Sequence, residues 1–488
     1  MTSSTVLPDP SLIEPMAIDE PLSALVQRAP ISVPPTATIR QAIELMGKFS
    51  AGSVAIVDEA GAPLGLLTQT DVVRRIVLGG IPLDKPVSEA MTREPVALPP
   101  TATVSEAAFA MATHGFRHLL IVDEHGVLTG VVSQRDLFGA CQRAGIGHLR
   151  RAIDTAEDVD VLKNVLGDVR QLAFQMLAQG IGAEQMTLFI SSFNDAVTRR
   201  ILDLRLRHHA LGDIAWAWLA FGSEGREEQT LSTDQDNGIV FVADDGGIET
   251  RRTRLLAFAA EVNADLDRCG FPLCKGNIMA SNPQWCLTLG EWQRRFSNWI
   301  DNPQPEALLN ATIFFDFRPL YGQLDLAERM HAHLFRFSRA DQAFQKMLAI
   351  NALRVVPPLG LIRDFSTETD EHGEAYIDLK KSGARLFVDA ARVLALAHGL
   401  PAASTVRRLR ESASLPGGLG EQTEAMIEAF NFIQLLRLRQ QHRAAAAGQK
   451  CDNRVYVGRL NELDRRILKE ALRQAKSLQQ RLKLNYQI

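Results

Sequence analysis

An ungapped internal repeat is the feature that most limits what this 488-residue chain can fold into. Shifting the sequence by 65 residues superimposes the Pro-Pro-Thr-Ala-Thr segment 34–38 on 99–103, and the Ile-Val-Asp-Glu segment 56–59 on 121–124. Because one constant offset holds without a gap, the N-terminal third contains two copies of one module. A module of this length exposes one face of a small sheet, so we expect the two copies to pack against each other.

Each copy contains the signals of a short mixed α/β unit. A Pro-Pro-Thr turn leads into a helix with apolar residues at intervals of three and four, beginning near Ile39 in the first copy. Two short apolar strands follow, separated by a turn with Asp and Gly, and a second helix then begins. The predicted strands are Val54–Val57 and Leu64–Leu67 in the first copy, and Leu119–Val122 and Val127–Val132 in the second.

Both copies close with the pattern Gly-hydrophobic-hydrophobic-Thr/Ser-x-x-Asp, which ends at Asp71 and at Asp136. This pattern and the order of the elements resemble a tandem pair of CBS domains. The resemblance implies that the cleft between the repeats binds an adenine nucleotide, with Asp71 and Asp136 holding ribose hydroxyls and with the hydroxyls of Thr68 and Ser133 assisting. A carboxylate can accept two hydrogen bonds from a ribose diol, and a helix N-terminus favours phosphate. The two aspartates could instead serve only as helix N-caps.

A second constellation combines a Gly-Ser turn with two nearby acids. Gly222 and Ser223 end an apolar run, and Asp234 and Asp236 precede a β-branched run at 238–242 that is expected to be a strand. Side chains alternate along extended chain, so the two aspartates point to the same side. Adjacent carboxylates repel unless a cation neutralises them, and such oxygen ligands suit Mg²⁺. The Gly-Ser turn can bring backbone N–H groups and a hydroxyl to a triphosphate.

This arrangement resembles the nucleotidyltransferase superfamily, whose fold is a polymerase-β-like mixed sheet with helices. The segments 222–226 and 233–237 resemble, more narrowly, a bacterial signalling branch in which the transferase is fused to CBS repeats. That branch is related to the protein-PII uridylyltransferases and the glutamine-synthetase adenylyltransferases. The superfamily prefers an apolar residue between the two acids, where this chain has Gln235. The resemblance implies transfer of a nucleoside monophosphate from a nucleoside triphosphate to an acceptor.

Superfamily members supply a third acid from a later strand, and Asp316 is the candidate here. It lies in the apolar segment 312–320, a predicted strand whose Asp-x-Arg ending is similar to the adenylyltransferase segment with the third acid. Asp234, Asp236 and Asp316 would then hold two metal ions for in-line attack on the α-phosphorus. Asp316 could instead pair with Arg318 or cap the following turn.

Three further features have two readings each. Arg226 could bind a phosphate or form a structural ion pair with Glu224 or Glu228. The Gly-, Asn- and Pro-rich loop at 274–285 either shapes a substrate pocket or only turns the chain, and its Cys274 has no sequence neighbour that would activate it as a nucleophile. The Lys380-Lys381 pair could meet a nucleotide phosphate or be solvated surface.

These observations predict an α+β multidomain protein in which a helical region separates the repeats from the transferase-like domain. The expected parts are an N-terminal tail (1–22), CBS repeat 1 (23–82), CBS repeat 2 (83–145), a helical connector (146–210), a nucleotidyltransferase domain (211–325) and a C-terminal helical substrate-binding domain (326–488).

Bulk properties narrow the setting. The N-terminus has no signal-peptide pattern, no apolar run is long enough to cross a bilayer, and five scattered cysteines do not form a disulfide framework, so a cytoplasmic protein is expected. A net charge of −4 argues against nucleic acid as a partner, although the C-terminal segment is basic. CBS pairs commonly associate in twos, so a homodimer is expected.

The leading hypothesis is a Mg²⁺-dependent nucleotidyltransferase of bacterial signalling, similar to protein-PII uridylyltransferase, that modifies a regulatory protein or a small molecule. Its CBS repeats would regulate it by binding an adenine nucleotide. A catalytically silent nucleotide-sensing module is the first alternative. An RNA nucleotidyltransferase is the second, for which a more basic surface would be expected.

Overall fold

The computed structural model describes residues 21–26, 29–49, 51–93, 95–114, 116–244, 246–304, 308, 311–360, 364–449 and 451–488. The chain divides into two compact units, Met1–Leu149 and Arg150–Ile488. Within the described ranges, no helix combines the length and the apolar character that a membrane span requires.

The first unit repeats its structure as it repeats its sequence. In each copy a short strand pairs in parallel with the first strand of an antiparallel hairpin. Val54 faces Leu67 in one hairpin and Leu119 faces Val132 in the other, so the 65-residue offset extends to the strand register. The elements are β1 (Ser32–Val33), α1 (Ile39–Lys48), β2 (Ser53–Val57), β3 (Pro63–Thr68), α2 (Gln69–Asp71, followed by a π-helix Val72–Val77), β4 (Thr92–Arg93), β5 (Ala97–Leu98), α3 (Val104–His114), β6 (His118–Val122), β7 (Leu128–Ser133) and α4 (Gln134–Thr155).

The two repeats bury apolar surface against each other. Ala55 and Leu66 of the first repeat form one buried cluster with Leu120 of the second. The Leu128 N–H also donates to the Gly61 carbonyl at 3.0 Å. The predicted packing of the two copies is therefore confirmed, and burial of this kind is what a half-exposed sheet requires.

The predicted N-terminal tail ends differently from what we expected. Leu22, its last residue, is fully buried in the core of the second repeat, and its N–H donates to the Ala102 carbonyl at 2.8 Å. Of the other tail residues, 1–20 lie outside the described residues.

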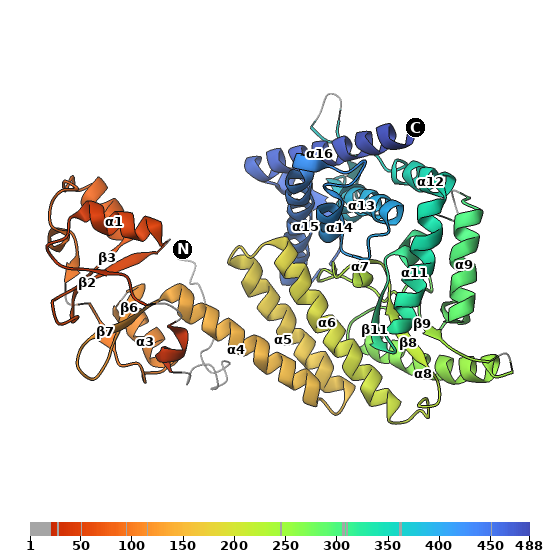
Figure 1. Cartoon of the computed structure of the whole chain (residues 1–488), viewed down its shortest axis with the longest axis horizontal. Helices are drawn as coiled ribbons and strands as arrows, with labels where there is room; N and C mark the ends of the chain where they lie inside the picture. The colour runs from red at the N-terminus through yellow and green to blue at the C-terminus, as the bar shows by residue number, and fades with distance from the viewer. Residues whose placement is uncertain are drawn as a thin grey trace. The chain divides into compact units, whose positions relative to one another are not determined.

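The second unit is built around a four-stranded mixed sheet in the order β10-β9-β8-β11 (Figure 1). β10 is parallel to β9, whereas β8 is antiparallel to both β9 and β11. The helices of the predicted connector precede the sheet. These elements are α5 (Val159–Ala178), α6 (Ala183–Leu206), β8 (Trp216–Ala220), α7 (Gly222–Gly225), β9 (Asn237–Phe241), α8 (Ile248–Arg268), β10 (Cys286–Thr288), α9 (Leu289–Asp301), β11 (Arg318–Gly322) and α11 (Asp325–Ala340).

The predicted strand at 312–320 is only partly a strand. Thr312–Phe315 is a turn of 3₁₀-helix, and β11 begins at Arg318, after Asp316. Phe314, Phe315 and Phe317 are all buried in one core. A strand would send Phe314 and Phe315 to opposite faces, whereas a tight helical turn lets both rings reach the same interior.

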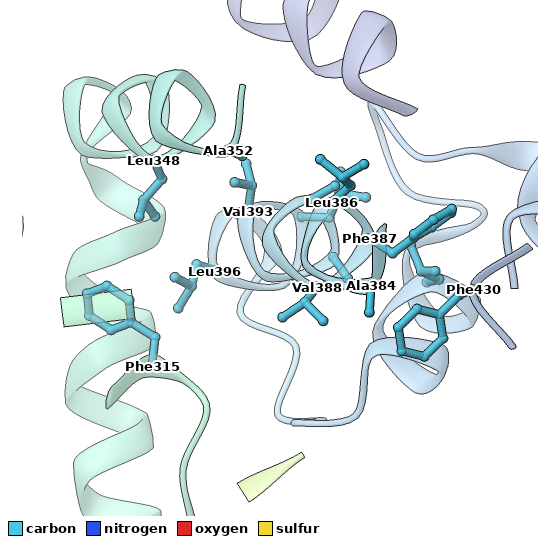
Figure 2. Packing of buried hydrophobic residues seen from close by; sticks show 14 of the residues in the cluster. Phe315, Leu348, Ala352, Ala384, Leu386, Phe387, Val388, Val393, Leu396 and Phe430 are labelled. Atoms are coloured by element: carbon cyan, nitrogen blue, oxygen red, sulfur yellow. The ribbon is translucent and has the colours of Figure 1, made fainter. Parts of the chain in front are cut away.

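The C-terminal helices surround α13, which is buried on nearly all sides. Figure 2 shows its side chains between Leu348 on one side and Phe430 on the other. Its apolar side chains belong to the same core as the aromatic residues under the sheet, and the two charged side chains that it buries, Asp389 and Arg392, pair with each other. The elements are α12 (Gln342–Ala352), β12 (Glu368–Thr369), β13 (Ala375–Asp378), α13 (Arg385–His398), α14 (Thr405–Ser412), α15 (Thr423–Ala446), β14 (Arg454–Tyr456) and α16 (Glu462–Tyr486).

Candidate functional site

The two aspartates of the Asp-x-Asp motif converge immediately before β9. Among the described residues, Asp234, Asp236 and Cys274 are the side chains that could share a metal ion, because one ligand atom from each lies within 4.8 Å of the others. The two acids were predicted to point to the same side, and the structure places them so. Cys274 joins them from the loop at 274–285, which sequence reasoning had left as either a pocket wall or a simple turn.

Gln235 points away from the acids into a buried amide network. Its side-chain N–H groups donate to the carbonyls of Asn263 and Phe271 at 3.0 and 2.8 Å, and its oxygen accepts from Asn263 at 2.7 Å. Asn263 also donates to Asn237 Oδ1, which accepts a further bond from the Ala280 N–H at 2.8 Å. The polar residue that departs from the superfamily pattern therefore anchors the acid motif to α8 and to the loop.

The acid pair lies in a strongly perturbed electrostatic environment. Burial, and then the negative charge of Asp234, raise the pKa of Asp236 to about 7. A hydrogen bond from the Cys274 thiol and the positive charges of Lys380 and Arg226 act in the opposite direction. A divalent cation would remove the repulsion that keeps this carboxylate partly protonated at neutral pH.

The thiol itself is not an activated nucleophile. Burial, and then the charge of Asp236, raise the pKa of Cys274 to about 11. Because the thiolate is the reactive form, this residue is a poor nucleophile in the metal-free state.

The Gly-Ser turn borders the acid pair. Gly222 has a φ of +56°, and a Cβ at this position would lie 2.9 Å from Ile313 Cγ1 and 3.4 Å from Asp236 Oδ2. The preceding Phe221 N–H donates to the Asp236 carbonyl at 2.8 Å. Glycine is therefore required both for the backbone conformation and for the close approach, and Ser223 follows it in α7.

Lys380 comes to this site from the C-terminal helical region. The preceding residue, Leu379, donates its N–H to the Asn453 carbonyl at 3.0 Å. The segment that contains Asn453 is in turn linked to the acid motif, because the Ser232 hydroxyl donates to the Cys451 carbonyl at 3.1 Å. Both Lys380 and Lys381 are exposed, but the charge of Lys380 acts on Asp236, whereas Lys381 pairs with Asp378. The sequence could not distinguish the two lysines, because only the fold shows which of them has a charge that acts on the acid pair.

Asp316 does not join the acid pair. It is fully buried, and its two carboxylate oxygens accept hydrogen bonds at 2.5–3.0 Å from the guanidinium groups of Arg226, Arg392 and Arg408. Burial alone would raise the pKa of Asp316, but these three positive charges outweigh it and hold the pKa well below its usual value. The interpretation of Asp316 as the third metal ligand must be corrected, because guanidinium groups occupy both of its oxygens. The pairing with Arg318 that we had considered is not the one observed.

Arg226 belongs to the same buried cluster. Its guanidinium donates to Glu228 at 2.8 Å and to Asp316 at 2.7 Å. Glu228 in turn accepts from the Thr405 N–H, at the start of α14, at 2.6 Å. Of the two roles considered for Arg226, the ion pair with Glu228 is the one present, and it ties the end of α7 to the C-terminal helices.

In the first unit, the predicted ribose-binding residues form two matching capping boxes. Asp71 accepts from the Thr68 N–H and hydroxyl at 3.0 and 2.6 Å, and Asp136 accepts from those of Ser133 at 2.8 and 2.6 Å. The aspartates thus stand three residues after the N-cap rather than at it. A cleft of about 1330 Å³ lies between the repeats, and its lining includes Thr68, Ser133, Asp136 and His118.

Comparison with known proteins assigns three family models to the chain. Residues 22–78 and 87–143 match the CBS domain. Residues 167–306 match the model described as "Putative nucleotidyltransferase DUF294", and residues 342–486 match "Putative nucleotidyltransferase substrate binding domain". The CBS domain-containing protein YhcV of Bacillus subtilis is 36% identical over 106 residues, which cover 22% of this chain and 74% of that protein. This chain belongs to the CBS domain-containing proteins.

Two further proteins are similar to about the same share of this chain. A 17.7 kDa protein of Acidianus ambivalens is 33% identical over 105 residues, so that the chain spans 63% of that protein's length and the match covers 22% of this chain. A solved CBS domain protein from Pyrobaculum aerophilum, complexed with AMP, is 31% identical over 24% of this chain and 89% of its own, with a TM-score of 0.23. The CBS pair, the transferase-like domain and the helical C-terminal region together confirm the predicted α+β multidomain fold.

Asp316 allows a direct test of the buried cluster. Asp316→Asn should lower the free energy of unfolding of the second unit by about 3–5 kcal/mol at neutral pH, since three guanidinium groups would lose their shared anion. All five tryptophans lie in this unit, so tryptophan fluorescence during urea unfolding measures it selectively. Asp213→Asn, which breaks a pair with Arg254 at the surface, should leave the same quantity nearly unchanged.

The pH dependence of this difference follows from the depressed pKa of Asp316. The stabilisation is complete above the unfolded-state pKa of about 3.9 and is lost as the pH falls below it toward the folded-state value. The difference between wild type and variant should therefore be constant near neutrality and shrink in acid. A variant as stable as wild type at pH 7 would contradict the structural role of Asp316.

Proposed function

We propose that this protein is a metal-dependent nucleotidyltransferase that moves a nucleoside monophosphate from a nucleoside triphosphate to a protein or a small molecule. The observation that carries the proposal is the contact between the Gly222-Ser223 turn and the acid pair, where a Cβ on Gly222 would lie 3.4 Å from Asp236. A phosphate-binding turn and a cation-binding acid pair are thereby neighbours, which is what a metal–triphosphate complex needs. The match of residues 167–306 to a nucleotidyltransferase family supports the same conclusion.

The residues divide the chemistry as follows. Asp234 and Asp236 would hold Mg²⁺, which when bound would polarise the α-phosphate of the transferred nucleoside monophosphate and neutralise the pyrophosphate that leaves. The backbone N–H groups and hydroxyl of the Gly222-Ser223 turn would orient the triphosphate. Lys380, whose charge already acts on Asp236, would neutralise phosphate oxygens from the C-terminal side. Arg226 and Asp316 would position this arrangement through the buried ion cluster without touching the substrate.

The CBS repeats would supply the regulation. Each repeat contains one Ser/Thr–Asp pair, and Thr68 of the first repeat and Ser133 and Asp136 of the second line the cleft. A carboxylate at such a place can accept both hydroxyls of a ribose. We propose an adenine nucleotide as the ligand and a cytoplasmic homodimer as the working form. A regulatory protein comparable with protein PII is the acceptor class that the family resemblance favours.

One observation favours a second function. Superfamily catalysis uses three acids, and here the third is bound by arginines instead of facing the pair. A nucleotide-sensing module that binds a metal–nucleotide complex without turnover would need only the Gly-Ser turn and the two remaining acids. The two functions share the binding site and differ in whether a nucleoside monophosphate is transferred.

Transfer of label separates them. Full-length protein is incubated with Mg²⁺, one α-labelled nucleoside triphosphate at a time, and cell extract as the source of acceptor. We expect label on a macromolecule or small molecule, reduced more than about 100-fold in Asp234→Asn, because loss of even an outer-shell partner of a metal ligand costs about 10–100-fold. Asp244→Asn removes an exposed carboxylate from the same domain and should keep full activity.

The opposite result has a clear meaning. If nucleotide binding depends on Asp234 but label is transferred from none of the nucleoside triphosphates, the protein is the sensing module and not the enzyme. Transfer that survives Asp234→Asn would show that the acid pair is not its centre.

The CBS cleft is tested by nucleotide titration calorimetry. Asp71→Asn and Asp136→Asn should each weaken the binding of AMP or ATP by about 10-fold or more, since a hydrogen bond to a charged group contributes about 1.5–3 kcal/mol. Asp84→Asn, at an exposed position of the same unit, should bind as wild type does. Equal affinities in all variants would place the nucleotide elsewhere.

A further inference from the structure

The loop that contains Cys274 is fixed to the transferase sheet. The Asn277 N–H donates to the Cys274 carbonyl at 2.9 Å, and Asn277 adopts a left-handed conformation with a φ of +54°. The Asn277 carbonyl accepts bonds from Asn282 and from the Trp285 indole at 2.9 and 3.1 Å. The Asn237 N–H donates to the Ile278 carbonyl at 3.1 Å, next to the acid motif. The thiol is therefore held at the acid pair by a defined backbone.

The thiol lies close to both carboxylates of the pair. The Cys274 sulfur lies within 4.8 Å of a ligand oxygen from each aspartate. In a tetrahedral Zn²⁺ site with metal–ligand bonds of about 2.0–2.3 Å, ligand atoms are about 3.3–3.8 Å apart. A contraction of about an ångström at the ends of three side chains would reach that geometry.

We propose that Asp234, Asp236 and Cys274 form a binding site for a thiophilic divalent cation of the Zn²⁺ class, which competes there with Mg²⁺. The competition rests on the proposed function, whereas cation binding itself does not. On binding, a metal–sulfur bond forms and the thiol proton leaves to solvent, so that the bound cation faces three anionic ligands. Three protein ligands leave the fourth position open, as in zinc sites that also bind water or substrate.

The chemistry of the ligands sets the selectivity. Mg²⁺ is a hard cation that takes oxygen ligands and keeps several waters, so it gains little from a thiolate. Thiolate ligands select softer ions, and Zn²⁺ accepts sulfur and carboxylate oxygen together. Removing the sulfur should therefore weaken Zn²⁺ binding strongly and Mg²⁺ binding little, whereas removing either aspartate should weaken both.

Cd²⁺ provides a spectroscopic probe of the sulfur, because a cadmium–thiolate bond absorbs in the ultraviolet. Full-length, nucleotide-free protein is titrated with Cd²⁺, and then with Zn²⁺ to displace it. We expect an absorption band that saturates at one ion per chain, disappears in Cys274→Ser and persists in Cys451→Ser, which removes a half-buried thiol outside the cluster. Calorimetry should show Zn²⁺ affinity lowered at least tenfold in Cys274→Ser and Mg²⁺ affinity changed less than twofold.

A measurement on the unmodified chain guards against a variant that fails to fold. Zn²⁺ should protect Cys274, identified by peptide mapping, from alkylation by iodoacetamide. A cadmium band that survives Cys274→Ser, unchanged Zn²⁺ affinity, or alkylation of Cys274 unaffected by Zn²⁺ would each overturn the proposal. Zn²⁺ binding without nucleotide transfer would refute only the proposed function, and transfer with Mg²⁺ but no thiol-dependent Zn²⁺ site would refute only this inference.

Discussion

The carboxylate of Asp316 is shut off from solvent and is shared by three guanidinium groups that come from different parts of the second unit. Arg226 ends α7, whereas Arg392 and Arg408 lie on α13 and α14 of the C-terminal region. Removing one partner from such a cluster leaves uncompensated buried charge, so the members hold one another in place. The acids Glu228 and Asp389 balance the remaining positive charge.

This cluster explains how residues from the two segments that match different family models, 167–306 and 342–486, come together at the candidate site. Arg226 caps the short helix α7 that begins with Gly222 and Ser223, so fixing its guanidinium also fixes the turn that borders Asp236. The same contacts hold the C-terminal helices against the sheet, and the segment that contains Lys380 belongs to that region. The groups that we propose for metal and phosphate binding are thus positioned by a buried ionic core. In this proposal the sequence motif supplies the ligands, and the buried ions determine their mutual placement.

The comparison of sequence and structure shows where local patterns suffice. The repeat strands and the common side of Asp234 and Asp236 followed from periodicity, because alternation is a property of neighbouring residues. Asp316 was misassigned because an Asp-x-Arg ending reads alike whether the acid faces a metal or arginines 76 and 92 residues further along the chain. The sequence singled out Cys274 and the Lys380-Lys381 pair, but it did not relate either of them to the acid pair. Their proximity to Asp236 depends on tertiary packing, which spacing does not report.

The central claim is that the acid pair and the Gly-Ser turn together bind a metal–triphosphate complex. A crystal structure of the full chain with Mn²⁺ and a non-hydrolysable nucleoside triphosphate tests it most directly, because the anomalous signal of manganese locates the ion. The account predicts an anomalous peak between the carboxylates of Asp234 and Asp236, with the triphosphate against Gly222 and Ser223. Manganese and triphosphate bound away from these residues, with the acid pair free of both, would contradict it.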